Sequence, residues 1–410
     1  MPARRRLLIL SQVYVPDPAA VGQHLHDVAK AMAKRGWDVR VVCSSRGYDD
    51  PSQRYPRHEI RDGVTIRRYG LPLFSKTNMP LRLFGSAWAM AAIFFLSLFS
   101  GRLDCVLFST SPPMVGLLGL TVAALKRARS VYWAMDLNPD QLLAMGKLKR
   151  GSFLHRALER INKTIIARSR LIVALDRFMA ERLRADGRRP QEVLTIAPWP
   201  LESVAAGPSH AENVFRHQHG LDGKFVVMYS GNHSPANPLD TVLAAMDKLK
   251  DDDSLRFAFI GGGIDKAKVR KFIADRKIGN ALELPYQPIE TLPASLSAAD
   301  VHVVTLGNNM VGIVHPCKVY GAMTVGRPLL FVGPSPSHVD DLLRQNDIGR
   351  SVSHGDVDGC VAAILALRDL SDESRQAMGR TAMAVLAATL SEARLNGQFC
   401  DAIERISPAI

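Results

Sequence analysis

One lysine stands where a short helix is expected to begin, and its charge is opposite to the one that this position favours. Pro316 fits the first helical position, His315 fits the cap before it, and Gly326 supplies a stop signal. Lys318 then falls in the first turn, where the positive end of the helix dipole favours an acid. A bound anion would remove the conflict, and a side chain that points into water is the plainer alternative. The spacing makes His315 and Lys318 candidate anion-binding residues.

Glycines follow two apolar runs of strand length in the second half of the chain. Gly231 and Asn232 come directly after the run 225–230, and a glycine there would let backbone N–H groups approach a diphosphate. Gly261–Gly263 follows the next run. Neither segment continues into the Gly-Lys-Ser/Thr of a Walker loop or has the full dinucleotide fingerprint. Ordinary turns remain the alternative for each.

Polar residues at other expected strand ends complete the set of candidates. Tyr286 and Gln287 follow a third apolar run and could seat a base. Asp136 ends the run 130–136, where a carboxylate would face a cleft, although an Asp before a proline-containing turn is also a common cap. Gly22 and Gln23 open the first helix, and the glycine would let a substrate approach. No group of residues shows metal-ligand spacing, and we expect no metal.

The elements that position these residues are alternating strands and helices. Apolar runs of strand length alternate with segments of helical period, which is the βαβ pattern of a parallel sheet covered by helices. After a connection rich in Pro, Ser and Gly near residues 197–213 the alternation begins again. The sequence therefore predicts an α/β protein with two doubly wound, Rossmann-like domains. The expected strands are 7–14, 39–44, 104–109, 130–136, 171–176, 193–197, 225–230, 255–260, 281–284, 301–305 and 328–332.

Composition bounds the class of protein. The 410 residues suit two domains, and the 47% hydrophobic content excludes a mainly disordered chain. Residues 1–200 hold 32 Lys and Arg against 15 Asp and Glu, whereas residues 201–410 hold 20 against 24. The first half is therefore expected to face something anionic. The five cysteines are scattered and odd in number, which favours reduced thiols. The apolar run after Arg4–Arg6 is too short for a signal peptide and predicts a buried strand.

The segment 83–101 contains nineteen residues without a charge. A membrane span here would divide one sheet between two sides of a bilayer, so we predict either a buried core helix or a helix in the membrane interface. Candidate membrane residues are Phe84, Trp88, Phe94 and Phe95. No nucleic-acid-binding motif accompanies the charge, which favours anionic lipid as partner. The supporting basic residues are Arg54, Arg57, Arg61, Arg67, Arg68, Lys76, Lys147, Lys149 and Arg150.

Taken in order, these motifs resemble the family 4 glycosyltransferases of the GT-B fold, near the bacterial polysaccharide and lipopolysaccharide enzymes that include N-acetyl-L-fucosamine transferases. The resemblance covers nearly the whole chain. The matching segments are Tyr14–Gln23 with Ala33–Val39, Ser111–Pro113, Met135–Asp140, Tyr229–Asn232, Leu284–Pro288 with Ala298–Val301, and Pro316–Tyr320 with Gly326–Pro328.

The resemblance implies an acceptor-side domain at 1–205, a nucleotide-sugar-binding domain at 206–385 and a terminal helix within 386–410 that packs back on the first domain. Gly231, Asn232 and Lys318 would bind the donor diphosphate, while Asp136 and Gly22 would face the reacting sugar or the acceptor. Two glutamates that hold the donor in most family members are replaced here by Ile313 and Gly321.

The expected function is retaining transfer of a hexosyl or N-acetylhexosaminyl group, without a metal, from a UDP-sugar to a lipid-linked or membrane-embedded acceptor. The expected location is the cytoplasmic face of the inner membrane, with peripheral attachment. A nucleotide-sugar epimerase of the same fold, and a catalytically weak membrane-associated partner of a transferase, are the alternatives.

Overall fold

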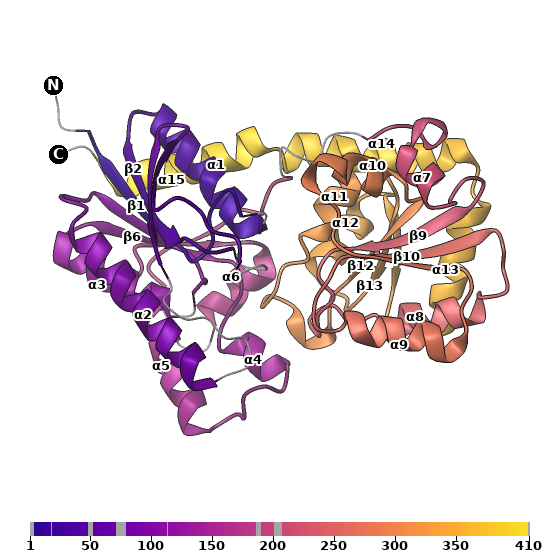
Figure 1. Ribbon diagram of the computed structural model, residues 1–410, viewed down its shortest axis with the longest axis horizontal. Coiled ribbons are helices and arrows are strands. Elements are labelled where there is room, and N and C mark those ends of the chain that lie inside the picture. Colours follow the sequence, from indigo (N-terminus) through magenta and orange to yellow (C-terminus); the bar gives the residue numbers. More distant parts are fainter. Residues whose placement is uncertain are drawn as a thin grey trace. The chain divides into compact units, whose positions relative to one another are not determined.

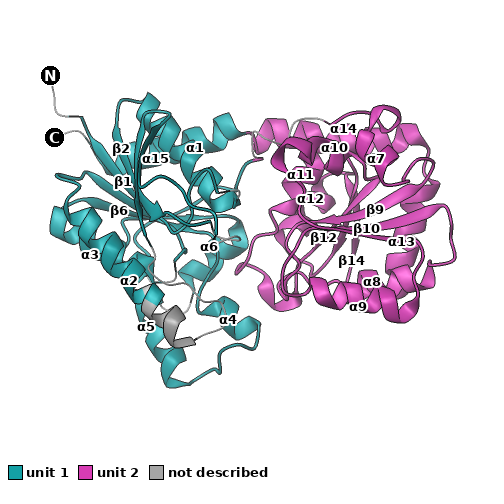
Figure 2. Ribbon diagram, viewed as in Figure 1, with its two compact units in different colours: residues 1–199, 392–410 teal, residues 200–391 magenta. Residues whose placement is uncertain are grey.

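The computed structural model describes residues 4–17, 19–47, 52–70, 79–112, 114–185, 190–200 and 207–408, without the side chains of 79–84 and 86. It divides into two compact units (Figure 2), of which unit 1 comprises residues 1–199 with 392–410 and unit 2 comprises residues 200–391. The chain therefore crosses from one unit to the other twice.

Unit 1 is built on an eight-stranded sheet in the order β3-β4-β2-β1-β5-β6-β7-β8. Every strand pair is parallel except β3 and β4, which form an antiparallel edge. Figure 1 shows the sheet, with β1, β2 and β6 labelled. Its elements are β1 (Arg6–Leu10), α1 (Ala20–Lys34), β2 (Asp38–Ser44), β3 (His58–Arg61), β4 (Val64–Tyr69), α2 (Met79–Leu98), β5 (Cys105–Phe108), α3 (Val115–Lys126), β6 (Arg129–Ala134), α4 (Asp140–Ala144), α5 (Phe153–Arg168), β7 (Leu171–Ala174), α6 (Arg177–Arg184), β8 (Val193–Thr195) and α15 (Glu392–Ile406).

Unit 2 is built on a six-stranded parallel sheet in the order β11-β10-β9-β12-β13-β14. Its elements are η1 (His210–Glu212), α7 (Val214–Gln218), β9 (Phe225–Ser230), α8 (Asp240–Lys248), β10 (Leu255–Ile260), α9 (Lys266–Arg276), β11 (Ala281–Leu284), η2 (Ile289–Thr291), α10 (Leu292–Ser297), β12 (Val301–Thr305), η3 (Asn308–Met310), α11 (Lys318–Thr324), β13 (Leu329–Val332), α12 (His338–Gln345), β14 (Gly349–Val352), α13 (Val357–Asp369) and α14 (Asp372–Thr389).

The central strands are uninterrupted apolar runs because helices cover both faces of each sheet. Leu7–Leu10 of β1 and Leu329–Val332 of β13 are fully buried. Helix α1 buries Leu25, Val28 and Met32, which share one face at helical spacing. This alternation of buried strands with one-sided helices confirms the predicted α/β class and the two doubly wound sheets.

The structure corrects several boundaries. Strand β6 ends at Ala134 rather than at Asp136, and β1 ends at Leu10, because the backbone beyond each turns away to form the loops at the strand ends. The antiparallel pair β3 and β4 was not predicted. Its strands are short, and Ile60 of β3 is exposed, so the pair lacks a continuous apolar signal.

The terminal helix α15 is part of unit 1. Its buried face includes Phe399, whose ring centroid lies 4.6 Å from that of Trp133, and Ile403. Arg35 of α1 forms ion pairs with Asp401 at 2.6 Å and Glu404 at 2.8 Å. The last helix therefore completes the core and one edge of the first unit.

Candidate functional site

The order of strands in unit 2 reverses between β9 and β12, because the chain passes from β9 outward to β11 and then returns to β12. Open parallel sheets bind ligands beside the carboxyl ends of their strands at such a reversal. Here β9 is followed by Gly231 and β12 ends at Thr305. All donor-side residues expected from the sequence belong to unit 2.

The loops after β9 and β10 pack backbone against backbone. Gly231 and Gly261 have φ values of +131° and +123°, which favour glycine. A Cβ atom on Gly261 would lie 2.1 Å from the carbonyl oxygen of Gly231. The N–H of Gly231 donates to the carbonyl of Ile260 at 2.9 Å. Both glycines are therefore required by the close approach of the two loops.

The rest of the β9 loop is also fixed by hydrogen bonds. The Tyr229 hydroxyl donates to the carbonyl of Asn232 at 2.7 Å, and the N–H of His233 donates to the carbonyl of Gly262 at 2.7 Å. The N–H of Asn232 has no acceptor among the described residues. The N–H of Asn232 is therefore available to a ligand in a loop whose shape is fixed by its other hydrogen bonds.

Lys318 lies against this loop. A Cβ atom on Gly231 would lie 2.6 Å from Cε of Lys318. The ammonium donates to Oδ1 of Asn237 at 3.4 Å and lies 5.3 Å from the centroid of the Tyr229 ring. Asn237 donates from Nδ2 to the carbonyl of Thr305 at 2.7 Å, which turns Oδ1 toward the lysine.

The charge of Lys318 is not balanced by an acid in the described part of the chain, since no ion pair joins the ammonium to a carboxylate there. Lys318 is half-buried, and loss of hydration lowers its pKa to about 8. The structure therefore brings together a rigid glycine loop and a poorly solvated cation, which suits an anionic ligand.

His315 does not cap the helix as expected. Helix α11 begins at Lys318, with Cys317 at the cap position, because the N–H of Cys317 turns back to the carbonyl of His315 at 2.9 Å. His315 is buried, and its Nε2 lies 2.7 Å from the hydroxyl of Tyr320. That hydroxyl lies 3.0 Å from Nε2 of His338. His315 thus anchors the segment that carries Lys318.

Helix α11 has only seven residues, so the helix dipole adds little, and the case for an anion rests on the charge and burial of Lys318.

Tyr286 and Gln287 lie just past the end of β11. The Tyr286 ring is 52% exposed, and a Cβ atom on Gly262 would lie 2.8 Å from its Cε2. Gln287 donates from Nε2 to the carbonyl of Pro285 at 3.0 Å, within its own loop. The tyrosine therefore borders the glycine loops and presents an accessible ring.

The acceptor-side candidates belong to unit 1. Asp136 is half-buried, two residues beyond the end of β6. Gly22 is buried in the first turn of α1, where a Cβ atom would lie 3.0 Å from Cα of Tyr14. Close packing of α1 against the preceding loop therefore accounts for this glycine. Gln23 is half-buried beside it.

A cavity of about 340 Å³ lies at the carboxyl ends of β5 and β6 in unit 1. Its wall includes Tyr132, Leu142, Leu158 and Ile161, with Ser109 and Asn138 at the strand ends. Asn162 is 5% exposed, and its Nδ2 has no hydrogen-bond partner. The cavity is mainly apolar but contains one buried donor.

Helix α2 separates buried from exposed side chains. Ala89 and Ile93 are buried, whereas Trp88 and Phe95 are exposed by 46% and 58%, and Phe99, directly after the helix, is exposed by 75%. Phe94 is half-buried, and the side chain of Phe84 lies outside the described residues. Within the described part of the chain, no helix has the length and apolar character that a membrane crossing requires.

Sequence reasoning did not identify His233, Asn237 or Asn162. His233 is fully buried, and burial with the nearby charge of Lys266 lowers its pKa to about 4. Its Nδ1 lies 3.2 Å from the carbonyl of Gly262, and its Nε2 has no partner. The position of His233, two residues after Gly231, could have marked it in the sequence. The contacts of Asn237 and Asn162 depend on tertiary packing and leave no such signal.

Two family models match the chain in succession. Residues 19–199 match the glycosyl transferase 4-like domain, and residues 212–384 match the glycosyl transferases group 1. A probable glycosyltransferase of Pseudomonas aeruginosa, WbjE, is 26% identical over 397 residues, which cover 94% of each chain. A putative colanic acid biosynthesis glycosyl transferase of Escherichia coli, WcaI, is 25% identical over 343 residues, or 78% of this chain and 81% of the relative.

Solved structures share the fold over almost the whole chain. Sucrose-phosphate synthase of Thermosynechococcus elongatus has a TM-score of 0.76 at 15% identity, covering 98% of this chain and 99% of the other. HepE of Anabaena, solved with UDP and glucose, has a TM-score of 0.73 at 14% identity, covering 98% and 100%. Together with the matched domains and the two doubly wound sheets, these likenesses show that the chain belongs to the family 4 glycosyltransferases of the GT-B fold.

Proposed function

We propose that this protein is a retaining glycosyltransferase that moves a hexosyl or N-acetylhexosaminyl group from a UDP-sugar to a lipid-linked or membrane-proximal acceptor in the synthesis of a surface polysaccharide or glycolipid. The observation that carries the proposal is Lys318, a half-buried cation without an acidic partner in the described part of unit 2, packed against the glycine loop after β9. The similarity to WcaI, which is named for colanic acid biosynthesis, supports a role in polysaccharide synthesis, and the HepE structure with UDP supports the donor class.

The donor diphosphate would lie between Lys318 and the loop of Gly231 and Asn232. When the bond to the sugar breaks, negative charge grows on the departing diphosphate. The ammonium of Lys318 and the N–H of Asn232 would stabilise that charge from positions already fixed by hydrogen bonds, with little reorganisation. Because Lys318 supplies the positive charge, we propose that the reaction needs no metal. Tyr286 offers an exposed ring to the base.

The acceptor would bind to unit 1. We assign the mainly apolar cavity at the ends of β5 and β6 to the part of the acceptor near its lipid, with the buried Nδ2 of Asn162 as donor to an acceptor oxygen. Asp136, just beyond β6, would orient the acceptor or stabilise positive charge that develops on the donor sugar. Gly22 and Gln23 belong to the same acceptor-side unit.

Peripheral attachment to the cytoplasmic face of the inner membrane would bring the protein to such acceptors. Helix α2 contacts α3, which contacts α5, and α3 and α5 expose further apolar side chains. Lys147, Lys149 and Arg150 are exposed in the segment before α5 and suit anionic lipid. The exposed apolar residues of α3 and α5 are Leu117, Leu125, Phe153 and Leu154.

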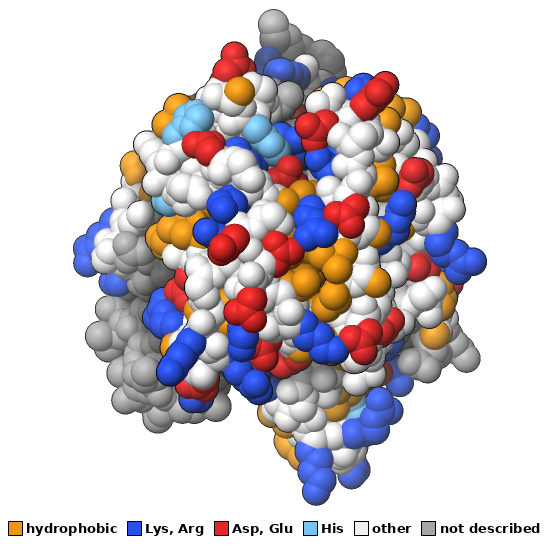
Figure 3. All heavy atoms as spheres, turned by 90° about the vertical axis from the view of Figure 1, so that its right-hand side faces the viewer, with side chains coloured by type: hydrophobic (Ala, Val, Ile, Leu, Met, Phe, Trp, Pro, Cys, Tyr) orange, Lys and Arg blue, Asp and Glu red, His pale blue; other side chains and the backbone are white. Residues whose placement is uncertain are grey.

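Two of the basic residues expected to support this surface, Arg68 and Lys76, are not among its described residues. Arg68 is buried and paired with Glu59 at 2.8 Å, so it cannot bind lipid. Lys76 lies outside the described residues. In Figure 3, which faces the right-hand side of Figure 1, basic and acidic side chains are interspersed over most of the visible surface.

The replaced glutamates bear on catalysis. Ile313 is 3% exposed, and Gly321 lies within α11, so neither position presents an acid to the donor. This observation favours, as a second candidate, a catalytically weak partner of a transferase that binds the donor without efficient turnover.

The proposal is tested by supplying purified protein with a panel of UDP-sugars and polyprenyl-diphosphate-linked sugars in detergent micelles, while UDP release and the glycolipid product are measured. We expect one pair to give product and UDP in equal amounts, with the anomeric configuration of the donor retained. Donor binding without product across the panel would favour the weak partner. Conversion of the free UDP-sugar to its epimer would favour an epimerase.

A further inference from the structure

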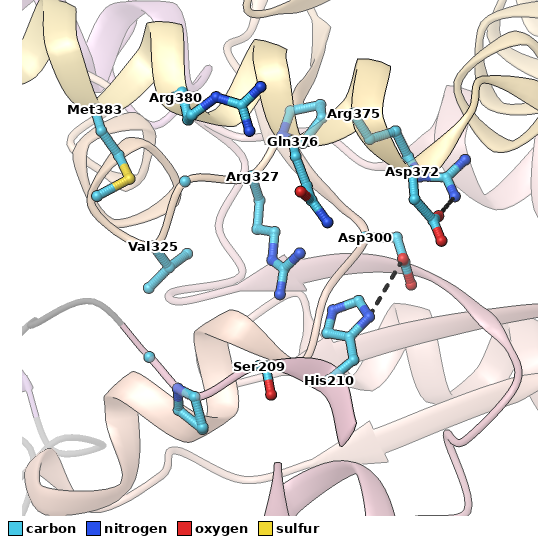
Figure 4. Close-up of a pocket in the computed structure, with 14 residues that line it drawn as sticks. Ser209, His210, Asp300, Val325, Arg327, Asp372, Arg375, Gln376, Arg380 and Met383 are labelled. Carbon is cyan, nitrogen blue, oxygen red and sulfur yellow. Dashed lines mark hydrogen bonds and ion pairs between the residues drawn. The ribbon is translucent and has the colours of Figure 1, made fainter. Parts of the chain in front are cut away.

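Unit 2 contains a second cavity, at the end of its sheet opposite to the glycine loops. Its volume is about 520 Å³. Asp300 and Pro328, which line it, directly precede β12 and β13, so the cavity lies at the amino ends of these strands. The other walls are the segment 207–210 and α14 (Figure 4). None of these residues takes part in the proposed donor site.

The cavity is built by direct packing of backbones. A Cβ atom on Gly379 of α14 would lie 2.0 Å from the carbonyl oxygen of Gly326. Gly326 has a φ of +63°, and a Cβ atom there would lie 2.8 Å from the sulfur of Met383. Helix α14 is thus held against the turn before β13, and the space beside this contact is part of the fold.

Most charges around the cavity are already paired. Arg375 donates from Nη1 to the carbonyl of Arg368 at 2.6 Å and also forms an ion pair with Asp372. Asp300 accepts from Nη1 of Arg216 at 3.2 Å and from the N–H of Val226 at 2.8 Å. His210 has its Nε2 at 3.2 Å from the carbonyl of Ser297.

Of the arginines that line the cavity, Arg327 and Arg380 form no ion pair with a carboxylate in the described part of the chain. Arg327 extends into the cavity (Figure 4), donates from Nη2 to the carbonyl of Ser297 at 2.9 Å, and has a buried Nε–H without an acceptor. Arg380 lies on α14 at the rim. The amide of Gln376, on the same helix, also points into the cavity (Figure 4).

We propose that this cavity binds a phosphate-bearing small molecule, at a site separate from the nucleotide-sugar donor. A guanidinium presents N–H groups in a planar fork that matches the oxygens of a phosphate. Within the described part of the chain, Nη1 of Arg327 and the guanidinium of Arg380 have no acceptor. Asp372 is paired with Arg375, and Asp300 is paired with Arg216, so three arginines and two carboxylates line the cavity and the positive charge is in excess. The volume exceeds that of a phosphate ion and lies in the range of small-molecule sites, which leaves room for an ester group.

Binding is measured by titration calorimetry on the full chain at constant ionic strength, with UDP at saturating concentration to occupy the donor site. The probes are inorganic phosphate and glycerol 3-phosphate. We expect at least one probe to bind the wild-type protein, with Arg380→Gln and Arg327→Gln each weakening its binding by about 10-fold, the scale of a charge-assisted hydrogen bond. Tighter binding of glycerol 3-phosphate assigns the site to an ester, and equal binding assigns it to the phosphate group alone.

Arg276→Gln is the matched control, because Arg276 is an exposed, ion-paired arginine of unit 2 outside the cavity. Its probe affinity should equal that of the wild-type protein, as should that of Lys318→Ala. If Arg327→Gln does not fold, Arg327→Lys keeps the charge but loses the fork and should still weaken binding. No binding to the wild-type protein, or equal affinity in the folded Arg380→Gln and Arg327→Lys variants, would overturn the proposal.

Discussion

The carboxyl ends of the two sheets offer very different environments for ligands. In unit 1, the cavity beside β5 and β6 is lined mainly by apolar side chains and has one buried amide donor. In unit 2, glycines form the loops after β9 and β10, and Lys318 adds a positive charge. Both sheets are doubly wound. The difference indicates that the fold supplies the position of a site, and under the proposed function the side chains at the strand ends would distinguish the acceptor from the anionic donor.

The largest expected effect comes from the acceptor side. Asp136→Asn keeps the shape of the side chain and removes its charge, so turnover should fall by about 100-fold, the scale of a positioned catalytic group. Donor affinity should stay unchanged, because the diphosphate would be held by unit 2. Turnover, donor affinity and melting temperature are measured on the same purified variant. Near-normal turnover in a folded variant would make Asp136 a structural cap.

The reciprocal change is on the donor side. Lys318→Ala should weaken donor binding by about 10-fold or more, since it removes a charge-assisted contact to the diphosphate. Calorimetry with the UDP-sugar measures the affinity. Lys266→Ala serves as the control for loss of a buried lysine. Lys266 also has a pKa lowered by burial, to about 8, but its ammonium donates to the carbonyl of Phe259 at 2.6 Å. An unchanged affinity in folded Lys318→Ala would remove the lysine from the site.

The residues of the candidate sites differ in how far they could be predicted from the sequence. Lys318 was recognisable because a cation at the start of a predicted helix is unusual, and Gly231 because it follows an apolar run. The fold class followed from the alternation of strands and helices. The start of α11 was wrong by two residues, since a turn through Cys317 replaces the expected proline start. Asn237 and Asn162 could not be found, because Asn237 meets Thr305, 68 residues away, and the neighbours of Asn162 come from several elements.

The surface of unit 1 that we propose faces the membrane, formed by α2, α3 and α5, provides a third contrast. Phe95→Ser should reduce binding to anionic liposomes several-fold, because it removes exposed apolar surface that would enter the lipid interface. Ile60→Ser is the control, since Ile60 is also an exposed apolar residue of unit 1, at 76% compared with 58% for Phe95, but lies on β3. Flotation with liposomes measures binding, and high salt should release part of the wild-type protein. Equal flotation of both variants would favour a purely structural helix.

A smaller effect is expected in the apolar cavity. Ile161→Thr replaces one wall of the cavity with a more polar side chain, so the acceptor KM should rise by about 3- to 10-fold, while the donor KM stays constant. Kinetics with a lipid-linked acceptor and with a short water-soluble analogue separate the two contributions. If both acceptors lose the same factor, the cavity does not contact the lipid-proximal part.

The smallest effect is a pH dependence confined to the donor side. Binding of an anion favours the protonated form of Lys318, whose pKa is about 8 in the free protein, so donor affinity should be highest below pH 8 and fall as the pH rises above it. Lys318→Arg keeps its charge over this range and should bind the donor with a flatter profile. Calorimetry on both sides of pH 8 makes the comparison. Identical profiles for the two proteins would exclude Lys318 as the titrating group.

The position of α15 has a consequence for the order of folding during synthesis. The residues of unit 2 form one continuous stretch, 200–391, which leaves the ribosome before α15 does. Unit 1 must wait for α15, since Phe399 covers Trp133 and Glu404 accepts from Nε1 of Trp37 at 3.1 Å. The domain encoded second can therefore complete its core first, and until then the nascent first domain exposes tryptophan surface that a chaperone would recognise.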